Sequence, residues 1–70
     1  MEFKLREEDE FIKLGQLLKA AGFADTGAEA KEMILNGEVT QNGKALLQRG
    51  KKLHEGEEVV FRNKIIRIIR

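Results

Sequence analysis

The sequence predicts an α+β domain in which two short helices pack on a small, mainly antiparallel sheet. Three observations support this fold class. Apolar residues recur at helical spacing twice within residues 11–35, a strong hairpin signal stands at Asn42-Gly43, and β-branched residues are frequent toward the C-terminus. A chain of 70 residues has a thin core, because it buries only about 60% of the surface exposed on unfolding. We therefore expect residues 1–70 to form a single domain.

The N-terminal residues predict a short edge strand followed by an acidic helix start. Residues 2–5 alternate polar and apolar, which places Phe3 and Leu5 on one face. Residues 7–10 are all acidic, and carboxylates in a first helical turn interact favourably with the positive end of the helix dipole. Paired carboxylates can also bind metal or act as acid–base catalysts. No histidine stands near this run, so we assign it the local role.

A first helix is predicted from the spacing of apolar residues over positions 11–21. Gly22 is the expected C′ residue, and Phe23 would contact Leu18 as in a Schellman ending. Gly15 lies inside the helix, where glycine costs roughly 1 kcal/mol relative to alanine. We expect a neighbouring element to approach closely at that point. The residues that share the apolar face are Phe11, Leu14, Leu17, Leu18 and Ala21.

The second helix is predicted to begin with a capping box. Thr26 can accept a hydrogen bond from the amide of Glu29, and the Glu29 side chain can reach back to the amide of Thr26. Asn36-Gly37 ends the helix, because glycine adopts the left-handed conformation without a Cβ clash. The link between the two helices is short, so we expect a compact pair. The apolar face of the second helix consists of Ala30, Met33 and Ile34.

Two hairpins are predicted in the second half of the chain. The Asn42-Gly43 turn pairs Thr40 with Ala45 and brings Val39 opposite Leu46. Residues 47–52, with the sequence LQRGKK, are predicted to form a loop before Leu53 returns to the core.

The last hairpin is predicted to turn at Asn63-Lys64. That turn would set Phe61 opposite Ile66 and Val59 opposite Ile68. The final residues are rich in β-branched side chains, which favours a closing strand over an interfacial helix.

The composition excludes most covalent catalysis. The chain has no cysteine, serine or tyrosine, so neither a Ser/His/Asp nor a Cys/His arrangement can be assembled, and zinc–cysteine sites and disulfides are excluded. His54 is the one histidine and lies beside a predicted turn, so we expect it at the surface. Residues 37–44 resemble a phosphate loop, but their glycine spacing and hairpin context do not fit one. We expect neither an enzyme nor a cofactor.

The sequence offers no membrane or export signal. The first ten residues lack the basic and apolar regions of a secretory signal. No apolar run approaches the roughly 20 residues that span a bilayer. We expect a cytoplasmic protein.

The net charge of +1 hides two halves of opposite sign. Residues 1–43 hold five Lys or Arg and nine Asp or Glu, a net charge of −4, whereas residues 44–70 hold eight and three, a net charge of +5. Phosphate oxygens suit both the planar fork of arginine and the point charge of lysine. Gly50 would let a phosphate approach the backbone closely. The predicted phosphate-binding cations are Lys31, Lys44, Arg49, Lys51 and Lys52. Ordinary surface charge remains the alternative reading of the composition.

The aromatic residues favour structured RNA over single strands. There is no Trp or Tyr, and all four phenylalanines fall on apolar faces. Single-strand binding needs exposed aromatic side chains on which bases stack. Recognition through phosphates and shape, as for double-stranded or folded RNA, is therefore the expected mode.

Three consecutive segments together resemble the S4-type RNA-binding domain. They are GFADTGAEAK at 22–31, ILNGEVTQNGK from residue 34, and RGKKLHEGEEVVF from residue 49. The order of helix, G-x-V, N-G, basic loop and a second G-[ED]-x-[VI] carries the resemblance, which covers about residues 11–61. It is strongest to small stand-alone bacterial proteins of the YaaA/YbcJ type. Many members have arginine where this chain has Gly27, whereas the stand-alone group tends to share this glycine and a lysine at position 31.

The resemblance implies an S4-like αL motif and non-catalytic binding of structured RNA. Ribosomal RNA or its precursors are the implied ligand, with a ribosomal particle as partner and the protein as a monomer. A small protein–protein adaptor, possibly ribosome-associated, that uses the C-terminal strand as a sheet edge is the alternative.

Overall fold

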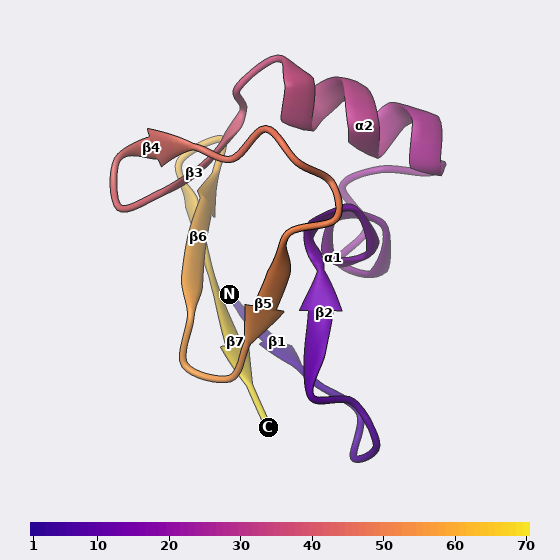
Figure 1. The fold of residues 1–70 in the computed structure, drawn as a ribbon, viewed down its shortest axis with the longest axis vertical. Helices are drawn as coiled ribbons and strands as arrows, with labels where there is room; N and C mark the ends of the chain where they lie inside the picture. Colours follow the sequence, from indigo (N-terminus) through magenta and orange to yellow (C-terminus); the bar gives the residue numbers. More distant parts are fainter.

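The computed structural model describes residues 1–70 and shows two helices beside a five-stranded sheet and a two-stranded ribbon (Figure 1). The larger sheet has the order β1-β7-β6-β3-β4, and only its β1–β7 pair is parallel. β2 and β5 form the antiparallel ribbon. The predicted fold class is confirmed. The elements are β1 (Glu2–Lys4), β2 (Phe11–Lys13), α1 (Leu14–Ala20), α2 (Gly27–Leu35), β3 (Val39–Gln41), β4 (Lys44–Ala45), β5 (Lys52–His54), β6 (Glu58–Phe61) and β7 (Lys64–Ile69).

One cluster of 14 buried apolar side chains joins the helices to the sheet. Both predicted helix faces point into it, except for Phe11 and Ala21, which lie outside α1 and are partly buried. No polar or charged residue is buried, so the core rests on apolar packing alone. The buried side chains are Leu14, Leu17 and Leu18 of α1, Ala30, Met33 and Ile34 of α2, and Leu5, Ala24, Val39, Leu53, Val59, Phe61, Ile66 and Ile68 of the remaining chain.

α1 begins three residues later than the sequence predicts. Residues 11–13 form β2 and pair with β5, so that Ile12 stands opposite Leu53. The assignment of Phe11 to the helix is therefore wrong. A ladder with a strand some 40 residues away overrides the local helical spacing, and local spacing cannot reveal that partner.

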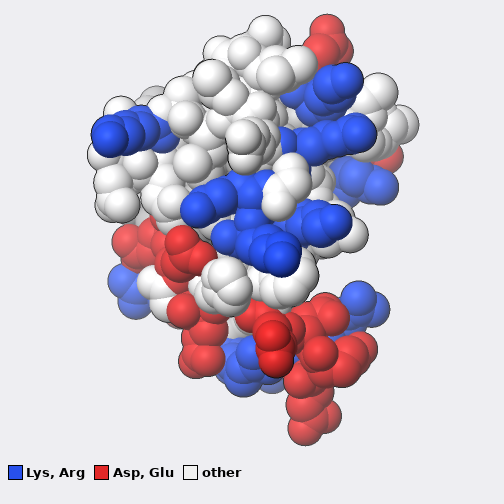
Figure 2. Space-filling model, in the orientation of Figure 1, with Lys and Arg blue, Asp and Glu red and all other residues white.

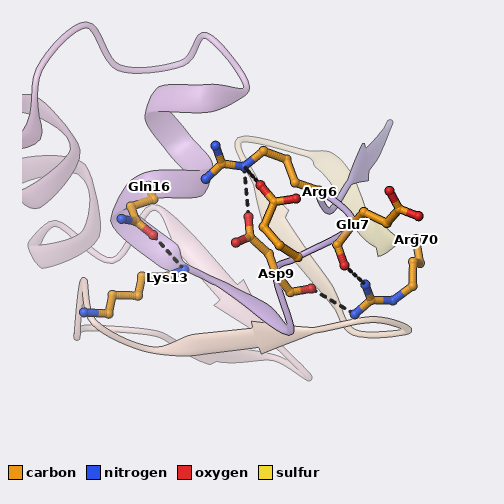
Figure 3. Close-up of polar contacts among 7 residues, drawn as sticks. Arg6, Glu7, Asp9, Lys13, Gln16 and Arg70 are labelled. Carbon is orange, nitrogen blue, oxygen red and sulfur yellow. Dashed lines mark hydrogen bonds and ion pairs between the residues drawn. The ribbon is translucent and has the colours of Figure 1, made fainter.

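The acidic residues 7–10 consequently lie in the β1–β2 loop and not in a helical turn, so their predicted role at the helix dipole is wrong. The Arg6 Nε donates to Asp9 Oδ2 at 3.0 Å. Arg70, from the C-terminus, donates to the carbonyl oxygens of Glu7 and Asp9 at 3.4 and 2.9 Å (Figure 3). Two arginines thus hold the loop that the acidic run forms.

Both helices end in Schellman motifs, as predicted for α1. Gly22 has a φ of 85°, and its amide donates to the carbonyl of Lys19 at 3.1 Å. The amide of Phe23 donates to the carbonyl of Leu18 at 2.9 Å. Gly37 has a φ of 75° and ends α2 at the predicted position.

The start of α2 forms half of the predicted capping box. Thr26 Oγ1 accepts from the amide of Glu29 at 3.1 Å. The Glu29 side chain does not return a hydrogen bond to the amide of Thr26. One of the four unpaired amides at this helix start is therefore satisfied by a side chain.

The first prediction concerns this cap. Thr26→Ala should lower the free energy of unfolding by about 1 kcal/mol, because the amide of Glu29 loses its acceptor. Thermal melts measure the effect, and Thr26→Ser is the matched control because it keeps the hydroxyl. Equal melting temperatures for the alanine and serine variants would contradict the role of Thr26 as the cap.

The hairpin at Asn42-Gly43 forms as predicted. Both turn residues have positive φ, 54° and 79°. Thr40 stands opposite Ala45, and the amide of Leu46 donates to the carbonyl of Val39 at 2.9 Å.

The last hairpin turns one residue earlier than predicted. Arg62 and Asn63 have φ values of 49° and 67°, and Val59 stands opposite Ile66. The predicted register is therefore wrong by two residues. Asn63, a residue type that tolerates the left-handed conformation, is a turn residue in both registers, so local turn chemistry does not decide between them. Because side chains alternate with a period of two, the shift leaves the same residues on the buried face.

β7 is an interior strand of the sheet, hydrogen-bonded to β1 on one side and to β6 on the other. The C-terminal strand is therefore not a free edge. The alternative hypothesis of an adaptor that uses this strand as a sheet edge is wrong on this point. β1 forms the predicted edge strand. Neither helix has the length and apolar character needed to cross a bilayer.

The second prediction compares neighbouring residues of β7. Ile66 is 0% exposed and Ile65 is 55% exposed, since they point to opposite faces. Ile66→Asp should unfold or aggregate the protein, because it places an unpaired charge in the core. Ile65→Asp should remain folded. Circular dichroism and size-exclusion chromatography distinguish the two, and a folded Ile66→Asp protein would show that β7 does not complete the core.

Candidate nucleic-acid interface

The loop of residues 47–51, which we call the basic loop, precedes β5 and is held to the start of α1 by backbone hydrogen bonds. The amide of Leu14 donates to the carbonyl of Lys51, and the amide of Gly15 donates to the carbonyl of Arg49, both at 2.9 Å. The first amides of a helix have no partner inside it, and Lys13 at the N-cap has no side-chain acceptor. Carbonyls of the loop therefore take the place of a capping side chain. Lys52, predicted in this loop, opens β5 instead.

The loop lies close against Gly15. A Cβ at that position would lie 3.4 Å from the Cβ of Arg49 and 3.5 Å from its carbonyl oxygen. The close approach predicted from a glycine inside a helix is confirmed, and the approaching element is the basic loop.

The third prediction follows from this contact. Gly15→Val adds two methyl groups beyond a Cβ that already touches Arg49, so the loop must move. We expect a loss of about 1–3 kcal/mol in the free energy of unfolding, as for overpacked sites. Ala20→Val on the exposed end of α1 is the control for β-branching alone and should cost less than about 1 kcal/mol. Equal losses in urea unfolding would mean that position 15 has room for a side chain.

The β2–β5 ribbon sets two lysines directly opposite one another. Lys13 and Lys52 are partners in its register, and like charges in that position destabilise a sheet. The Lys52 Nζ lies 4.9 Å from the centroid of the Phe11 ring, a cation–π contact that offsets part of this cost. Neither lysine has a carboxylate within ion-pair distance.

The remaining cations divide into paired and unpaired groups. All four arginines outside the basic loop form ion pairs with carboxylates, and three of these pairs have N–O distances of 3.0 Å or less. None of the predicted phosphate-binding cations forms such a pair, and all are exposed. Their charge remains available to an anion. The unpaired cations of the prediction are Lys31, Lys44, Arg49, Lys51 and Lys52.

Figure 2 shows Lys and Arg side chains gathered in a band over β5, β2 and the loop that precedes β5. Asp and Glu gather at the lower end of the molecule, near the β1–β2 loop. Among the predicted residues, 49–52 are consecutive and lie on this loop and the first position of β5. Lys44 lies on β4 and Lys31 on α2, so neither belongs to this consecutive run.

Lys13 and Lys19 are not among the residues predicted from the sequence. With Arg49 they line a shallow cleft of about 250 Å³ between α1, the start of α2 and the basic loop. The pairing of β2 with β5 brings Lys13 beside Lys52. A sequence-based assignment of residues 11–13 to the helix cannot predict this pairing. The other residues of the cleft wall are Gly15, Gln16, Gly27 and Gly50.

Glu57 lies beside the basic loop without neutralising it. Burial acts to raise the pKa of its carboxyl, but hydrogen bonds from the amide of His54 at 2.7 Å and from the side chain of Gln41 at 3.1 Å outweigh that effect. With the positive charge of Lys51 nearby, the net result is a lowered pKa. The carboxylate is therefore ionised near neutral pH and engaged by His54 and Gln41, with no ion pair to Lys51.

The structure places no three His, Asp or Glu side chains where they could hold a metal ion. The four phenylalanines are also poorly placed for stacking on bases. Phe61 is buried, Phe3 and Phe23 pack against the core, and Phe11 lies against His54 with a centroid distance of 5.8 Å. What the surface offers is positive charge and hydrogen-bond donors.

Comparisons with known proteins agree with this fold. A family model described as the S4 domain matches residues 3–69. The solution structure of YbcJ from E. coli, described as revealing an αL motif involved in RNA binding, is similar with a TM-score of 0.68 and 28% sequence identity. The match covers 99% of this chain and 86% of YbcJ. No curated protein sequence matches the chain.

Proposed function

The chain belongs to the S4 domain family, and from that premise we propose that it binds structured RNA without catalysis. The observation that carries the proposal is the similarity to YbcJ over nearly the whole chain, in a fold that presents an unpaired basic surface. The proposed ligand is ribosomal RNA or a precursor, within a ribosomal particle in the bacterial cytoplasm. Residues 1–70 act as one domain and as a monomer. The proposed contact residues are Lys31, Lys44, Arg49, Gly50, Lys51 and Lys52.

The docked loop supports phosphate binding in a specific way. Arg49 and Lys51 extend from a segment whose carbonyls are already bonded to α1, so the backbone loses little freedom when RNA binds. Arginine can grip a phosphate with two parallel hydrogen bonds, and lysine adds a point charge. Such contacts position the protein on the backbone without reading bases. We therefore expect similar affinities for different RNA sequences of the same fold.

The fourth prediction tests this surface by salt dependence. If about four cations neutralise phosphates, log affinity should fall against log salt with a slope of about −3 to −4. The change from about 50 to about 200 mM salt would then weaken binding roughly a hundredfold. Replacing Arg49, Lys51 and Lys52 together by alanine should reduce the slope by about three units, one for each lost contact.

The matched control removes the same charge elsewhere. Arg62, Arg67 and Arg70 are engaged by Glu38, Glu58 and Glu55, so their replacement by alanine should change the slope much less. Filter binding to a ribosomal RNA fragment across a salt series gives both slopes. If the loop variant is folded and binds with an unchanged slope, the assignment of the site to this loop is wrong.

A further inference from the structure

We propose that the cleft lined by Lys13, Lys19 and Arg49 seats one phosphate group of the RNA backbone. This proposal rests on the proposed function and makes it more specific, because it adds two residues and a defined position to a surface otherwise described by charge. Three parts of the chain meet there: the β2–α1 segment, the start of α2, and the basic loop.

The cleft carries charge of one sign. Its wall includes three cations and no carboxylate, and none of the three forms an ion pair. A larger hollow of about 900 Å³ beside it also contains Lys13 and Lys19, together with Lys4 and Arg6, but its wall includes the carboxylates of Glu8, Asp9 and Glu10 as well. An anion therefore meets charges of both signs in the larger hollow and only positive charges in the smaller cleft.

The register of the ribbon adds a reason for an anion at this place. Lys13 faces Lys52, and this arrangement costs stability in the free protein. A phosphate near Lys13 would reduce the repulsion. Binding there would gain both from direct attraction and from relief of the like-charge pair.

The shape and the free donors of the cleft suit a phosphate. Gly15, Gly27 and Gly50 contribute no side chains to its wall, so a ligand can approach the backbone. Gln16 Oε1 accepts from the amide of Lys13 at 3.4 Å (Figure 3), which leaves its NH₂ group free to donate. The amide of Gly50 has no acceptor within the protein. These donors and the three cations together can satisfy several phosphate oxygens.

The cleft is continuous with the predicted contact residues. Arg49 and Gly50 belong to both, and Gly27 lies four positions before Lys31 on α2. Residues at i and i+4 share a helix face, so Lys31 lies one turn beyond the cleft on that face. A phosphate in the cleft would stand between the loop cations and Lys31 on the path of one RNA strand.

Two variants test the proposal in different ways. The double change Lys13→Gln and Lys19→Gln removes charge, whereas Gly27→Ala keeps every charge and adds a methyl group to the cleft wall. A Cβ at Gly27 meets no atom within 4 Å, so this protein should fold normally. The charge control is Lys4→Gln with Lys64→Gln, two lysines that also lack carboxylate partners but lie on β1 and β7.

Binding of a ribosomal RNA fragment across a salt series is the measurement. We expect the slope of log affinity against log salt to become less negative by about one to two units in the Lys13/Lys19 variant and to stay nearly unchanged in the Lys4/Lys64 control. Gly27→Ala should weaken binding several-fold at constant salt. In an NMR titration, inorganic phosphate should shift the amide signals of Gly15, Gln16 and Gly50 more than chloride does at equal ionic strength.

The outcomes separate this proposal from the function on which it rests. If the Arg49/Lys51/Lys52 variant loses affinity while the Lys13/Lys19 variant keeps the wild-type slope, RNA binding stands and the cleft proposal is overturned. A second result would also overturn it: the Lys13/Lys19 variant has a less negative slope, but Gly27→Ala binds with full affinity and phosphate causes no selective shift. The two lysines would then act only through their long-range electrostatic attraction. If the wild-type protein does not bind structured RNA, the proposed function fails and the cleft proposal fails with it.

Discussion

The contact between the start of α1 and the loop at residues 47–51 determines how the two halves of this molecule fit together. The amides of Leu14 and Gly15 have no partner within the helix and donate to the carbonyls of Lys51 and Arg49, and the loop lies within van der Waals distance of position 15. The β2–β5 ribbon continues the same contact by backbone pairing. The first helix is thereby joined by main-chain hydrogen bonds to the segment that connects the larger sheet with the ribbon, in addition to the apolar core. Arg49 and Lys51 lie on the loop that makes this contact, so the contact also fixes where their charges stand.

Ion pairs are unevenly distributed over the molecule: arginines of the larger sheet and the C-terminus have carboxylate partners, and the cations of the ribbon and the basic loop do not. The arginines of the larger sheet and the C-terminus pair with nearby glutamates, for example Arg67 with Glu58 across β6 and β7. The ribbon and the loop offer no such partner, and there Lys13 even faces Lys52. Exposed ion pairs add little stability individually, but each pair offsets the positive charge of its arginine with a nearby carboxylate. The unpaired positive charge of a nearly neutral protein thus lies largely on a loop whose backbone is hydrogen-bonded to α1 and on the ribbon beside it.

The features that sequence reasoning predicted well are those set by chemistry within a few residues. The hydroxyl of Thr26, the glycines at 22 and 37 and the Asn42-Gly43 turn each act on their immediate neighbours, and the structure has them in the predicted places. β2 was assigned to a helix because its partner is distant in sequence. The turn at Arg62-Asn63 differs by one position from the prediction because Asn63 fits either turn, so that local chemistry leaves the register open. The consecutive cations of the loop could be predicted as a group, whereas Lys13 and Lys19 join them only through tertiary packing.

The parallel pairing of β1 with β7 has a consequence for how the protein is made. Phe3 stands beside Ile68, and the amide of Arg67 donates to the carbonyl of Met1 at 3.0 Å, so residues near the two ends of the chain are neighbours in the sheet. Synthesis proceeds from the N-terminus, and β1 therefore has no parallel partner until β7 has been made. The helices and the first hairpin have local partners and can form earlier. Closure of the larger sheet at β1 is thus a late, long-range step of folding, since it joins residues more than 60 positions apart.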